Sequence, residues 1–374
     1  LSGFFLNPEL SLHHLVEIRN GGSDQGMKAK TEIKMGERRR RPVIIDCDPG
    51  HDDAMAILWA LSSEELDVKA VTTAAGNQTI QKVTDNALRV LEKAGRSDIP
   101  VAAGADRPLF RQFERGGELI HGESGLDGPG LPPAETEKSP KTALALMTEI
   151  LEQSREPVTI VAIGPLTNVG VLLLSRPDLR ERIEVISIMG GGTVGNWTPA
   201  AEFNIYVDPE AAKAVFSSGV PILMAGLDVT QKAYVTREEN ERLRAQKDAI
   251  SVFAAELIDF YSRYHYEVEG FPGCTLHDPC AVAVLLHPEL FEIKDCNVEI
   301  ETAGTFTSGM TVIDAVGYQE KLFKKKPVHN AGVLFQVDRE GFVEHFLEAM
   351  GRLGSLISQE VGGRKGSGEE DERS

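Results

Sequence analysis

Residues 42–61 of the chain read PVIIDCDPGHDDAMAILWAL, and this stretch decides how the rest of the sequence is interpreted. It opens with the apolar run 43–45, which is typical of a buried strand. Pro49 and Gly50 end that strand, because proline cannot donate to a ladder and glycine permits a sharp turn. Residues 54–61 are apolar on almost every side and predict a buried helix. The stretch therefore predicts a buried strand, a tight turn and a buried helix in direct succession.

Four aspartates crowd this strand-to-helix corner without a Lys or Arg among them. Asp46 and Asp48 are two residues apart, so both leave the strand on the same face. Asp52 and Asp53 fall in the first helical turn, where the helix dipole favours negative charge. Helix capping and solvation would explain one or two of the four, but four at the carboxyl end of a strand are typical of a ligand site in an open α/β sheet. Like charges this close raise one another's pKa, and we predict that a hard cation, Ca²⁺ or Mg²⁺, compensates them.

Composition limits the class of protein. The chain has 374 residues, a formal net charge of −18, 41% hydrophobic and 26% charged residues, as in ordinary globular proteins. The acidic balance argues against a general binder of nucleic acid or anionic membranes. No apolar run approaches the length needed to span a bilayer. The cysteines form no CxxC pair, and we expect a reducing, cytoplasmic setting; they are Cys47, Cys274, Cys280 and Cys296.

Strand and helix patterns alternate after the opening stretch. The predicted strands are 67–73, 99–103, 158–163, 184–189 and 220–224. The predicted helices are 79–94, 140–154, 209–218, 250–266, one that begins at 277–279, and 339–350. Because no clear linker interrupts the alternation, we predict one large α/β domain with a mostly parallel open sheet flanked by helices.

The predicted domain covers residues 42–358, with a small β-hairpin near 296–316 and a long Gly/Pro-rich loop at 116–133. Residues 1–41 lack sustained periodicity, and we expect an N-terminal extension that is flexible or foreign to the natural chain. Residues 359–374 are polar, and we expect a disordered tail.

Other polar residues follow predicted strands or open predicted helices. Each alone is more often a cap or a turn residue, but together they predict a polar pocket at one edge of the sheet, suited to a polyhydroxylated ligand beside a metal. These residues are Asn77, Thr167, Asn168, Asn196, Glu202, Asn204, His277 and Asp278. The glycines of 190–195 match a dinucleotide fingerprint, but NWTP follows where a helix should begin, so this match fails. An EF-hand loop fails at Pro49 and Gly50.

The motif DCDPGHDD at 46–53 resembles the D-x-D-x-G-x-D-D signature of nucleoside hydrolases, the inosine-uridine-preferring N-ribohydrolases. The resemblance extends over residues 42–350, and it is nearest to the pyrimidine-preferring bacterial type. It continues in TTAAGNQT (72–79), HGESGLDG (121–128), AIGPLTN (162–168), MGGG with GNWTPAAEFNIYVDPEAA (189–212) and HDP (277–279).

The resemblance implies a role for each matching residue. It implies a Ca²⁺ site made by Asp48, Asp53, Asp278 and the backbone carbonyl of Thr167, with Asp46 as a support behind it. Asp48 would also be the general base for the attacking water, and His277 the group that protonates the leaving base. His121 would lie near the base, and one or more of Tyr261, Tyr264 and Tyr266 would line its pocket. The residues implied to bind ribose are Asp52, for the 2′-OH, and Asn77, Asn196, Glu202 and Asn204.

Residues and resemblance together predict Ca²⁺-dependent hydrolysis of the N-glycosidic bond of ribonucleosides such as uridine, inosine, cytidine or xanthosine, in salvage or catabolism, by a homodimer or homotetramer. Two alternatives stay open at this point. A haloacid-dehalogenase-like phosphohydrolase also begins with a strand and Asp-x-Asp, although Gly50 replaces its usual Thr or Val and no later Gly-Asp-x-x-x-Asp follows. A ribonucleoside-binding protein without catalysis would keep the same pocket.

Overall fold

The computed structural model describes residues 40–114, 116–325 and 329–367. In these residues nine strands form one sheet in the order β10-β9-β11-β6-β5-β4-β1-β2-β3. Every neighbouring pair is parallel except the two that involve β9, which confirms the predicted mostly parallel open sheet. The strands are β1 (Arg41–Cys47), β2 (Leu66–Thr73), β3 (Val101–Ala103), β4 (Val158–Ala162), β5 (Ile183–Met189), β6 (Ile222–Ala225), β9 (Phe291–Ile300), β10 (Thr311–Asp314) and β11 (Ala331–Val337).

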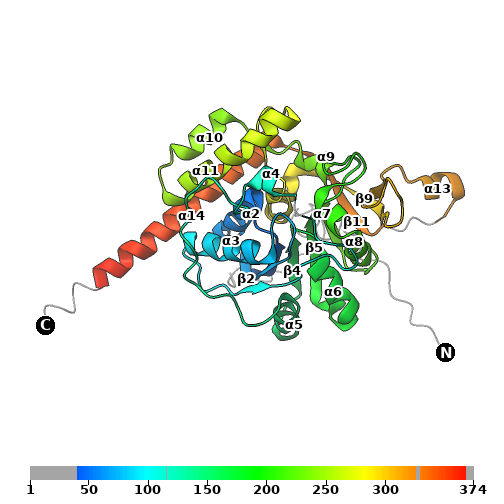
Figure 1. Cartoon of the computed structure of the whole chain (residues 1–374), viewed down its shortest axis with the longest axis horizontal. Helices are drawn as coiled ribbons and strands as arrows, with labels where there is room; N and C mark the ends of the chain where they lie inside the picture. Colours follow the sequence, from blue (N-terminus) through cyan, green and yellow to red (C-terminus); the bar gives the residue numbers. More distant parts are fainter. Residues whose placement is uncertain (1–39, 115, 326–328, 368–374) are drawn as a thin grey trace, which may run out of the picture. The chain divides into compact units, whose positions relative to one another are not determined.

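Helices cover both faces of the sheet (Figure 1). One face carries α2 (His51–Ser62), α3 (Ile80–Lys93), α11 (Ala249–Tyr264), α12 (Pro279–Leu286) and α14 (Arg339–Ser367). The other carries α5 (Ala143–Gln153), α6 (Thr167–Ser175) and α8 (Pro209–Phe216). Smaller elements are α4 (Glu118–His121), α7 (Phe203–Val207), α9 (Leu227–Thr230), α10 (Arg237–Arg244), α13 (Tyr318–Phe323), and the separate pair β7 (Tyr234–Val235) and β8 (Cys274–Thr275).

Strand β1 shows why a continuous apolar run is needed. Its side chains alternate between the faces, so Val43 and Ile45 join the core cluster that contains Trp59 of α2. Ile44 points the other way, into the core cluster that contains Met147 of α5. Because both faces are covered, neither alternate position tolerates a polar residue until the strand ends at the aspartates.

The order of the strands places a ligand crevice beside β1. From β1 the sheet grows in one direction through β2 and β3, and in the other through β4, β5 and β6. The chain therefore reverses direction across the sheet between β1 and β4, and open α/β sheets bind ligands at the carboxyl ends of the strands at such a point. Asp46 and Asp48 leave β1 there, and Thr167 begins α6 just after β4.

The structure differs from the predicted elements in several places, and the sequence did not predict helices α4, α6, α7, α9, α10 and α13. The predicted hairpin is present as β9 and β10, but it begins at Phe291 rather than near 296. Helix α14 continues to Ser367, beyond the predicted end near 350 and into the predicted tail at 359–374, because no proline interrupts the segment. Strand β11 was not predicted. The predicted N-terminal extension lies outside the described residues, except for Arg40 and Arg41. Within the described residues, no helix is long and apolar enough to cross a membrane.

Candidate active site

The start of α2 holds the acidic corner together. Gly50 is the N-cap residue of the helix and offers no side chain to the first backbone N–H groups. Asp53 instead holds the backbone just before the helix, since its Oδ1 accepts from the N–H of Asp48 at 3.1 Å and its Oδ2 accepts from the N–H of Gly50 at 2.9 Å. The carboxylate thereby fixes the turn that presents Asp48 and Asp52.

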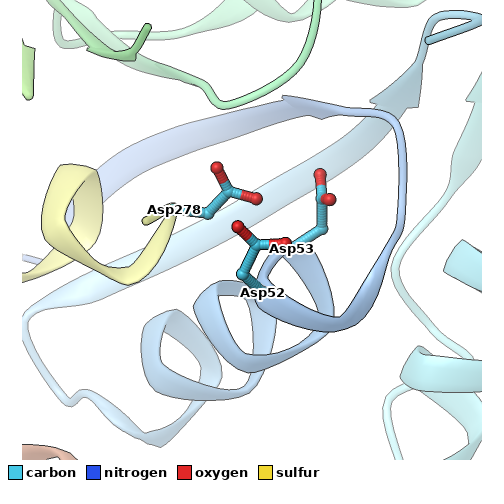
Figure 2. A group of neighbouring side chains, drawn as sticks. All are labelled: Asp52, Asp53 and Asp278. Atoms are coloured by element: carbon cyan, nitrogen blue, oxygen red, sulfur yellow. The ribbon is translucent and has the colours of Figure 1, made fainter. Parts of the chain in front are cut away.

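Three carboxylates converge from two helices. One oxygen from each of Asp52, Asp53 and Asp278 lies within 4.8 Å of the others, and all three residues are buried. Figure 2 shows Asp52 and Asp53 at the start of α2 facing Asp278 at the start of α12. The resemblance had implied Asp48, Asp53 and Asp278 as the side-chain ligands. The structure brings Asp53 and Asp278 together, and it adds Asp52, which had been assigned to ribose.

Asp48 lies beside this trio with one oxygen in use and one free. Its Oδ2 accepts from the N–H of Asn77 at 2.6 Å, whereas its buried Oδ1 has no hydrogen-bond partner among the described residues. Two glycines make room for the carboxylate: a Cβ on Gly76 would lie 2.1 Å from Oδ2, and one on Gly164 would lie 2.5 Å from Oδ1. The fold therefore preserves space around a buried, unsatisfied carboxylate oxygen.

Burial and mutual repulsion disfavour the charged forms in this corner. Burial raises the pKa of Asp52 to about 8 and that of Asp53 to about 6. The pKa values of Asp48 and Asp278 are raised well above the ordinary range, first by burial and then by neighbouring aspartates. Among the described residues that line the adjoining pocket, none is Lys or Arg. Carboxylate donors, an unpartnered buried oxygen and the lack of a basic side chain all fit a hard divalent cation.

Asp46 supports the corner from behind. Its Oδ1 accepts from the hydroxyl of Thr72 at 2.6 Å and from Nδ2 of Asn168 at 2.8 Å, and burial raises its pKa to about 7. Nδ2 of Asn168 also donates to the carbonyl of Thr73 at 2.9 Å, so these contacts connect β1, β2 and α6. The side chain of Thr167 turns away and donates to Oδ2 of Asp208 at 2.7 Å. The implied use of its carbonyl stays a prediction.

A pocket opens above the corner and collects most of the residues singled out from the sequence. It is lined by Asp52, Asn77, His121, Asn196, Glu202, Asn204, His277 and Asp278, together with Gly117, Ile120, Ile163, Met189, Trp197, Phe203, Tyr261, Tyr264, His265 and Glu269. Asp48, Asp53 and Thr167 lie outside this lining. The predicted polar residues, which come from distant parts of the sequence, thus share one cavity.

The polar residues of the pocket are held by the backbone. Asn77 donates from Nδ2 to the carbonyl of Asp48 at 3.1 Å. Glu202 caps α7, since its Oε1 accepts from the N–H of Asn204 at 2.9 Å and its Oε2 accepts from the N–H groups of Gly191 and Ile205. Nδ2 of Asn204 donates to two backbone carbonyls, at 3.0 and 3.2 Å, so its side-chain oxygen is the atom it can offer a ligand.

Asn196 also faces this part of the pocket. Its Oδ1 accepts from the N–H of Phe203 at 3.0 Å, which leaves its amide nitrogen as the group available to a ligand. The cavity therefore offers both a donor, on Asn196, and an acceptor, on Asn204, and a sugar hydroxyl can bond to either.

At the opposite end of the pocket, a chain of hydrogen bonds orders two histidines. Nδ1 of His265 lies 3.1 Å from the carbonyl of Tyr261, and because a carbonyl can only accept, this nitrogen carries the proton. The hydroxyl of Thr275 then donates to Nε2 of His265 and accepts from Nε2 of His277 at 2.9 Å. Nδ1 of His277 in turn accepts from the hydroxyl of Thr230 at 2.8 Å. One backbone carbonyl thus fixes the tautomers of both rings.

Burial keeps both rings neutral. It lowers the pKa of His277 to about 4 and that of His265 to about 3. His265 was not predicted as a site residue, because it lies inside the predicted helix 250–266 and nothing in the pattern marks it as buried against His277.

A second histidine pair and two tyrosines complete this end. His51, also missed from the sequence, donates from Nε2 to the carbonyl of Asp127 at 2.7 Å and lies 3.0 Å from His121 through the Nδ1 atoms. The hydroxyl of Tyr261 donates to Oδ2 of Asp52 at 3.2 Å. Tyr261 and Tyr264 line the pocket, whereas Tyr266 packs under the guanidinium of Arg237. The three candidate tyrosines therefore reduce to two.

Comparison with known proteins shows which family has this fold and this sequence. The profile of the family described as inosine-uridine preferring nucleoside hydrolase matches residues 43–344. The pyrimidine-specific ribonucleoside hydrolase RihA of Citrobacter koseri is 54% identical over 311 residues, covering 83% of this chain and 97% of that protein. RihA of Photobacterium profundum is 52% identical over 312 residues, covering 83% and 98%.

Solved structures agree with the sequence relatives. A purine-preferring ribonucleoside hydrolase from Gardnerella vaginalis superposes with a TM-score of 0.78 at 30% identity, covering 84% of this chain and 100% of that one. A plant nucleoside hydrolase, PpNRh1, superposes with a TM-score of 0.79 at 34% identity, covering 83% and 99%.

A parallel sheet with an acidic corner at its switch point, shared along nearly the whole length of these hydrolases, makes this protein a hydrolase that acts on N-glycosyl bonds of ribonucleosides. The chain belongs to the inosine-uridine preferring nucleoside hydrolase family. Both alternatives from the sequence, a phosphohydrolase and a binding protein without catalysis, are thereby set aside.

Proposed function

We propose that the protein is a Ca²⁺-dependent hydrolase that prefers pyrimidine ribonucleosides, uridine and cytidine above all. The observation that carries the proposal is the buried trio of Asp52, Asp53 and Asp278, of which Asp52 and Asp278 line a pocket that also contains amide, carboxylate and imidazole groups. The preference for pyrimidines is supported by the RihA relatives, which are named as pyrimidine-specific and are matched over nearly their whole length.

The cation would be held by Asp48, Asp53 and Asp278, with the carbonyl of Thr167 as a further ligand. A bound Ca²⁺ supplies positive charge that orients and acidifies a water molecule and fixes ribose hydroxyls. The unpartnered Oδ1 of Asp48 is the feature that favours this assignment, because a buried carboxylate oxygen without a partner is costly.

Asp48 is also our general base. Its Oδ2 is held by the N–H of Asn77, so Oδ1 has a fixed position from which to take a proton from the attacking water. Asp52 binds the 2′-OH of ribose, and the Tyr261 hydroxyl orients its carboxylate. Asn77, Asn196, Glu202 and Asn204 bind the remaining sugar oxygens. Carboxylates close to the ring also stabilise the positive charge that the sugar develops in the transition state.

His277 protonates the departing base. The resting ring is neutral, with its one proton on Nε2 donated to Thr275, so it must take up a second proton from solvent before it gives one to the base. The hydrogen bond from the Thr230 hydroxyl to Nδ1 fixes the resting tautomer and marks the nitrogen at which that second proton is taken up. His121 lies close to the base and shapes its site from α4.

The products, ribose and a free base, suit nucleoside salvage or catabolism. We place this activity in residues 42–358 and in the cytoplasm, in keeping with the free cysteines Cys47, Cys274, Cys280 and Cys296, and we expect a homodimer or homotetramer.

Ribose release from a panel of nucleosides tests the proposal. Purified protein is stripped of metal, reloaded with Ca²⁺ or Mg²⁺, and assayed with uridine, cytidine, inosine and xanthosine. We expect uridine and cytidine to give the highest kcat/KM and Ca²⁺ to restore the most activity. A preference for inosine, or full activity without metal, would contradict the corresponding part of the proposal.

A further inference from the structure

One carboxylate at the histidine end of the pocket has no assigned role. Glu269 lines the pocket, its side chain is 19% exposed, and its buried Oε2 has no hydrogen-bond partner in the described part of the chain. The Oε2 atom lies 3.7 Å from Nε2 of His265, but that nitrogen already accepts from Thr275. A buried carboxylate oxygen without a partner is costly unless a ligand satisfies it.

The backbone is irregular where it places this side chain. Helix α11 passes at His265 into a π-helical turn that ends at Glu269, and Gly270 follows in the left-handed region with a φ of 70°. π turns are rare and are frequent at functional sites. This turn reverses the expected burial, since Val268 is 67% exposed while Glu269 lines the cavity. Packing alone would favour the opposite arrangement, so the turn serves the pocket rather than the core.

The position of Glu269 assigns it to the base rather than to the sugar. It adjoins His265, which belongs to the hydrogen-bonded chain that ends at His277. The sugar-binding side chains, by contrast, lie around the acidic corner and α7. Ile120 and the ring of Tyr264 supply apolar lining in the same pocket. Apolar walls with a few placed polar groups are a typical lining for a site that binds a small molecule.

We infer that Glu269 binds the N3–C4 edge of the pyrimidine base and thereby contributes to base specificity. This inference rests on the proposed function. A carboxyl group can accept from N3–H of uracil and donate to its O4. The same group can donate to N3 of cytosine and accept from its 4-amino group, so one side chain matches both pyrimidines.

Burial supports the protonated form that this pairing requires, because it raises the pKa of Glu269 to about 7. A share of the molecules therefore carries a neutral carboxyl group at neutral pH, with one donor and one acceptor.

The test compares three substrates on Glu269→Ala and Glu269→Gln. 3-Methyluridine lacks the N3–H donor, and 4-nitrophenyl riboside lacks the whole edge. We expect wild type to prefer uridine over 3-methyluridine by at least about 10-fold in kcat/KM, which is the effect of one lost hydrogen bond in a specific site. In E269A this preference should shrink to within about 3-fold, through a loss on uridine of about 10–100-fold.

Three controls separate recognition from folding. The nitrophenyl riboside should be hydrolysed by E269A within about 2-fold of wild type, since it offers nothing for Glu269 to bind. E269Q keeps one donor and one acceptor and should retain most of the preference. Glu267→Ala, at an exposed position of the same π turn, should behave as wild type on all three substrates.

An unchanged ratio of uridine to 3-methyluridine in E269A would overturn the assignment, and so would an equal loss on all three substrates, which would indicate a structural role. Hydrolysis of the nitrophenyl riboside without hydrolysis of uridine by wild type would overturn the pyrimidine preference itself, and the assignment of Glu269 with it. The wild-type assay therefore distinguishes the two failures.

Discussion

The two ends of the pocket are built in different ways. At the sugar end, carboxylates and amides come from strand ends and helix starts, and their partners are mostly backbone groups, as for Asp53, Glu202 and Asn204. At the base end, the side chains bond to one another, as in the chain of His277, Thr275 and His265. His265 and Glu269 stand on a π turn, and His121 stands on a four-residue helix. The side chains at the sugar end are therefore held mainly by backbone groups of the fold, whereas those at the base end are held mainly by other side chains. We expect the family to share the first and to vary the second.

The largest effect should come from the metal. Removing Ca²⁺ leaves the buried carboxylates uncompensated, and hydrolysis of uridine should become undetectable because neither the water nor the ribose is then held. The measurement is ribose release after exhaustive chelation, with residual metal quantified. Activity that persists in verified metal-free protein would show that the acidic corner does not need a cation for hydrolysis. Readdition of Ca²⁺ should restore the rate, which controls for damage by the chelator.

Loss of the 2′-OH should have the next largest effect, and it too concerns the sugar end. We expect deoxyuridine and deoxyinosine to be hydrolysed at least ~10³ times less efficiently than their ribosides, because Asp52, Asn204 and one metal position would be left without a partner. Matched kcat/KM values at saturating Ca²⁺ give the answer. A ratio within about tenfold, or ~1.4 kcal/mol, would require the roles of Asp52 and Asn204 to be withdrawn.

The difference between the two ends also explains what the sequence could predict. Asp46, Asp48, Asp52 and Asp53 stand within eight consecutive residues, and a strand, a turn and a helix at that spacing bring them together whatever the rest of the chain does. The alternation of strand and helix patterns likewise predicted the parallel sheet and several of the helices that cover its faces. Strand β11 was missed because its position between β6 and β9 depends on pairing with distant strands, which no local pattern encodes.

The base end was less predictable for a physical reason. His51 is held by a residue far away in the sequence, whereas His265 and Glu269 are positioned by a π turn, which has no sequence signature comparable to a cap or a proline. The family resemblance indicated His277, His121 and a group of tyrosines, yet only the structure reduced the tyrosines to Tyr261 and Tyr264. Prediction thus succeeded where geometry is local and stopped where it is tertiary.

The base end should respond selectively to substitution. His277→Ala should slow hydrolysis of uridine by ~10²–10⁴, the usual contribution of general acid catalysis. The same variant should barely affect 4-nitrophenyl riboside, whose leaving group departs as a stable anion. Parallel kinetics on the two substrates provide the test. Equal losses on both substrates would show that His277 acts on the sugar rather than on the base. His277 would then no longer belong to the base end.

A subtler change probes the ordered chain. Thr230→Val removes the hydroxyl that bonds to Nδ1 of His277 while keeping the shape of the side chain. We expect uridine hydrolysis to fall by about 10-fold, since the imidazole loses the hydrogen bond that fixes its tautomer, and nitrophenyl riboside hydrolysis to stay within about 2-fold. Thr236→Val is a suitable comparison, because Thr236 caps α10 outside the pocket. If both variants lose the same activity on both substrates, the chain has no part in proton transfer.

The smallest expected effect is on stability, and it follows from opposite shifts at the two ends. Raised carboxylate pKa values mean that the folded, metal-free protein binds more protons than the unfolded chain, so the free energy of unfolding falls as the pH rises toward the folded pKa. The histidines act in the other direction: their lowered pKa values cost stability as the pH falls through about 6.5, the value in the unfolded chain. Between pH 6.5 and 8.5 the carboxylates outweigh the histidines, since Asp52 has a pKa of about 8 and Asp46 and Glu269 have pKa values of about 7. Metal-free protein should therefore lose about 1–2 kcal/mol over this range.

Thermal unfolding measures this loss directly. Tm of the metal-free protein should fall by about 2–5 °C from pH 6.5 to 8.5. Saturating Ca²⁺ should abolish the fall, because a bound cation favours the ionised carboxylates at both pH values, and its stabilising effect should accordingly be larger at pH 8.5. Asp52→Asn removes one of the groups that titrate in this window, so its metal-free Tm should change less with pH than that of wild type. A metal-free Tm that rises with pH instead would mean that the acidic corner is relieved by something other than protonation, and the contrast between a carboxylate end and a histidine end would lose its electrostatic basis.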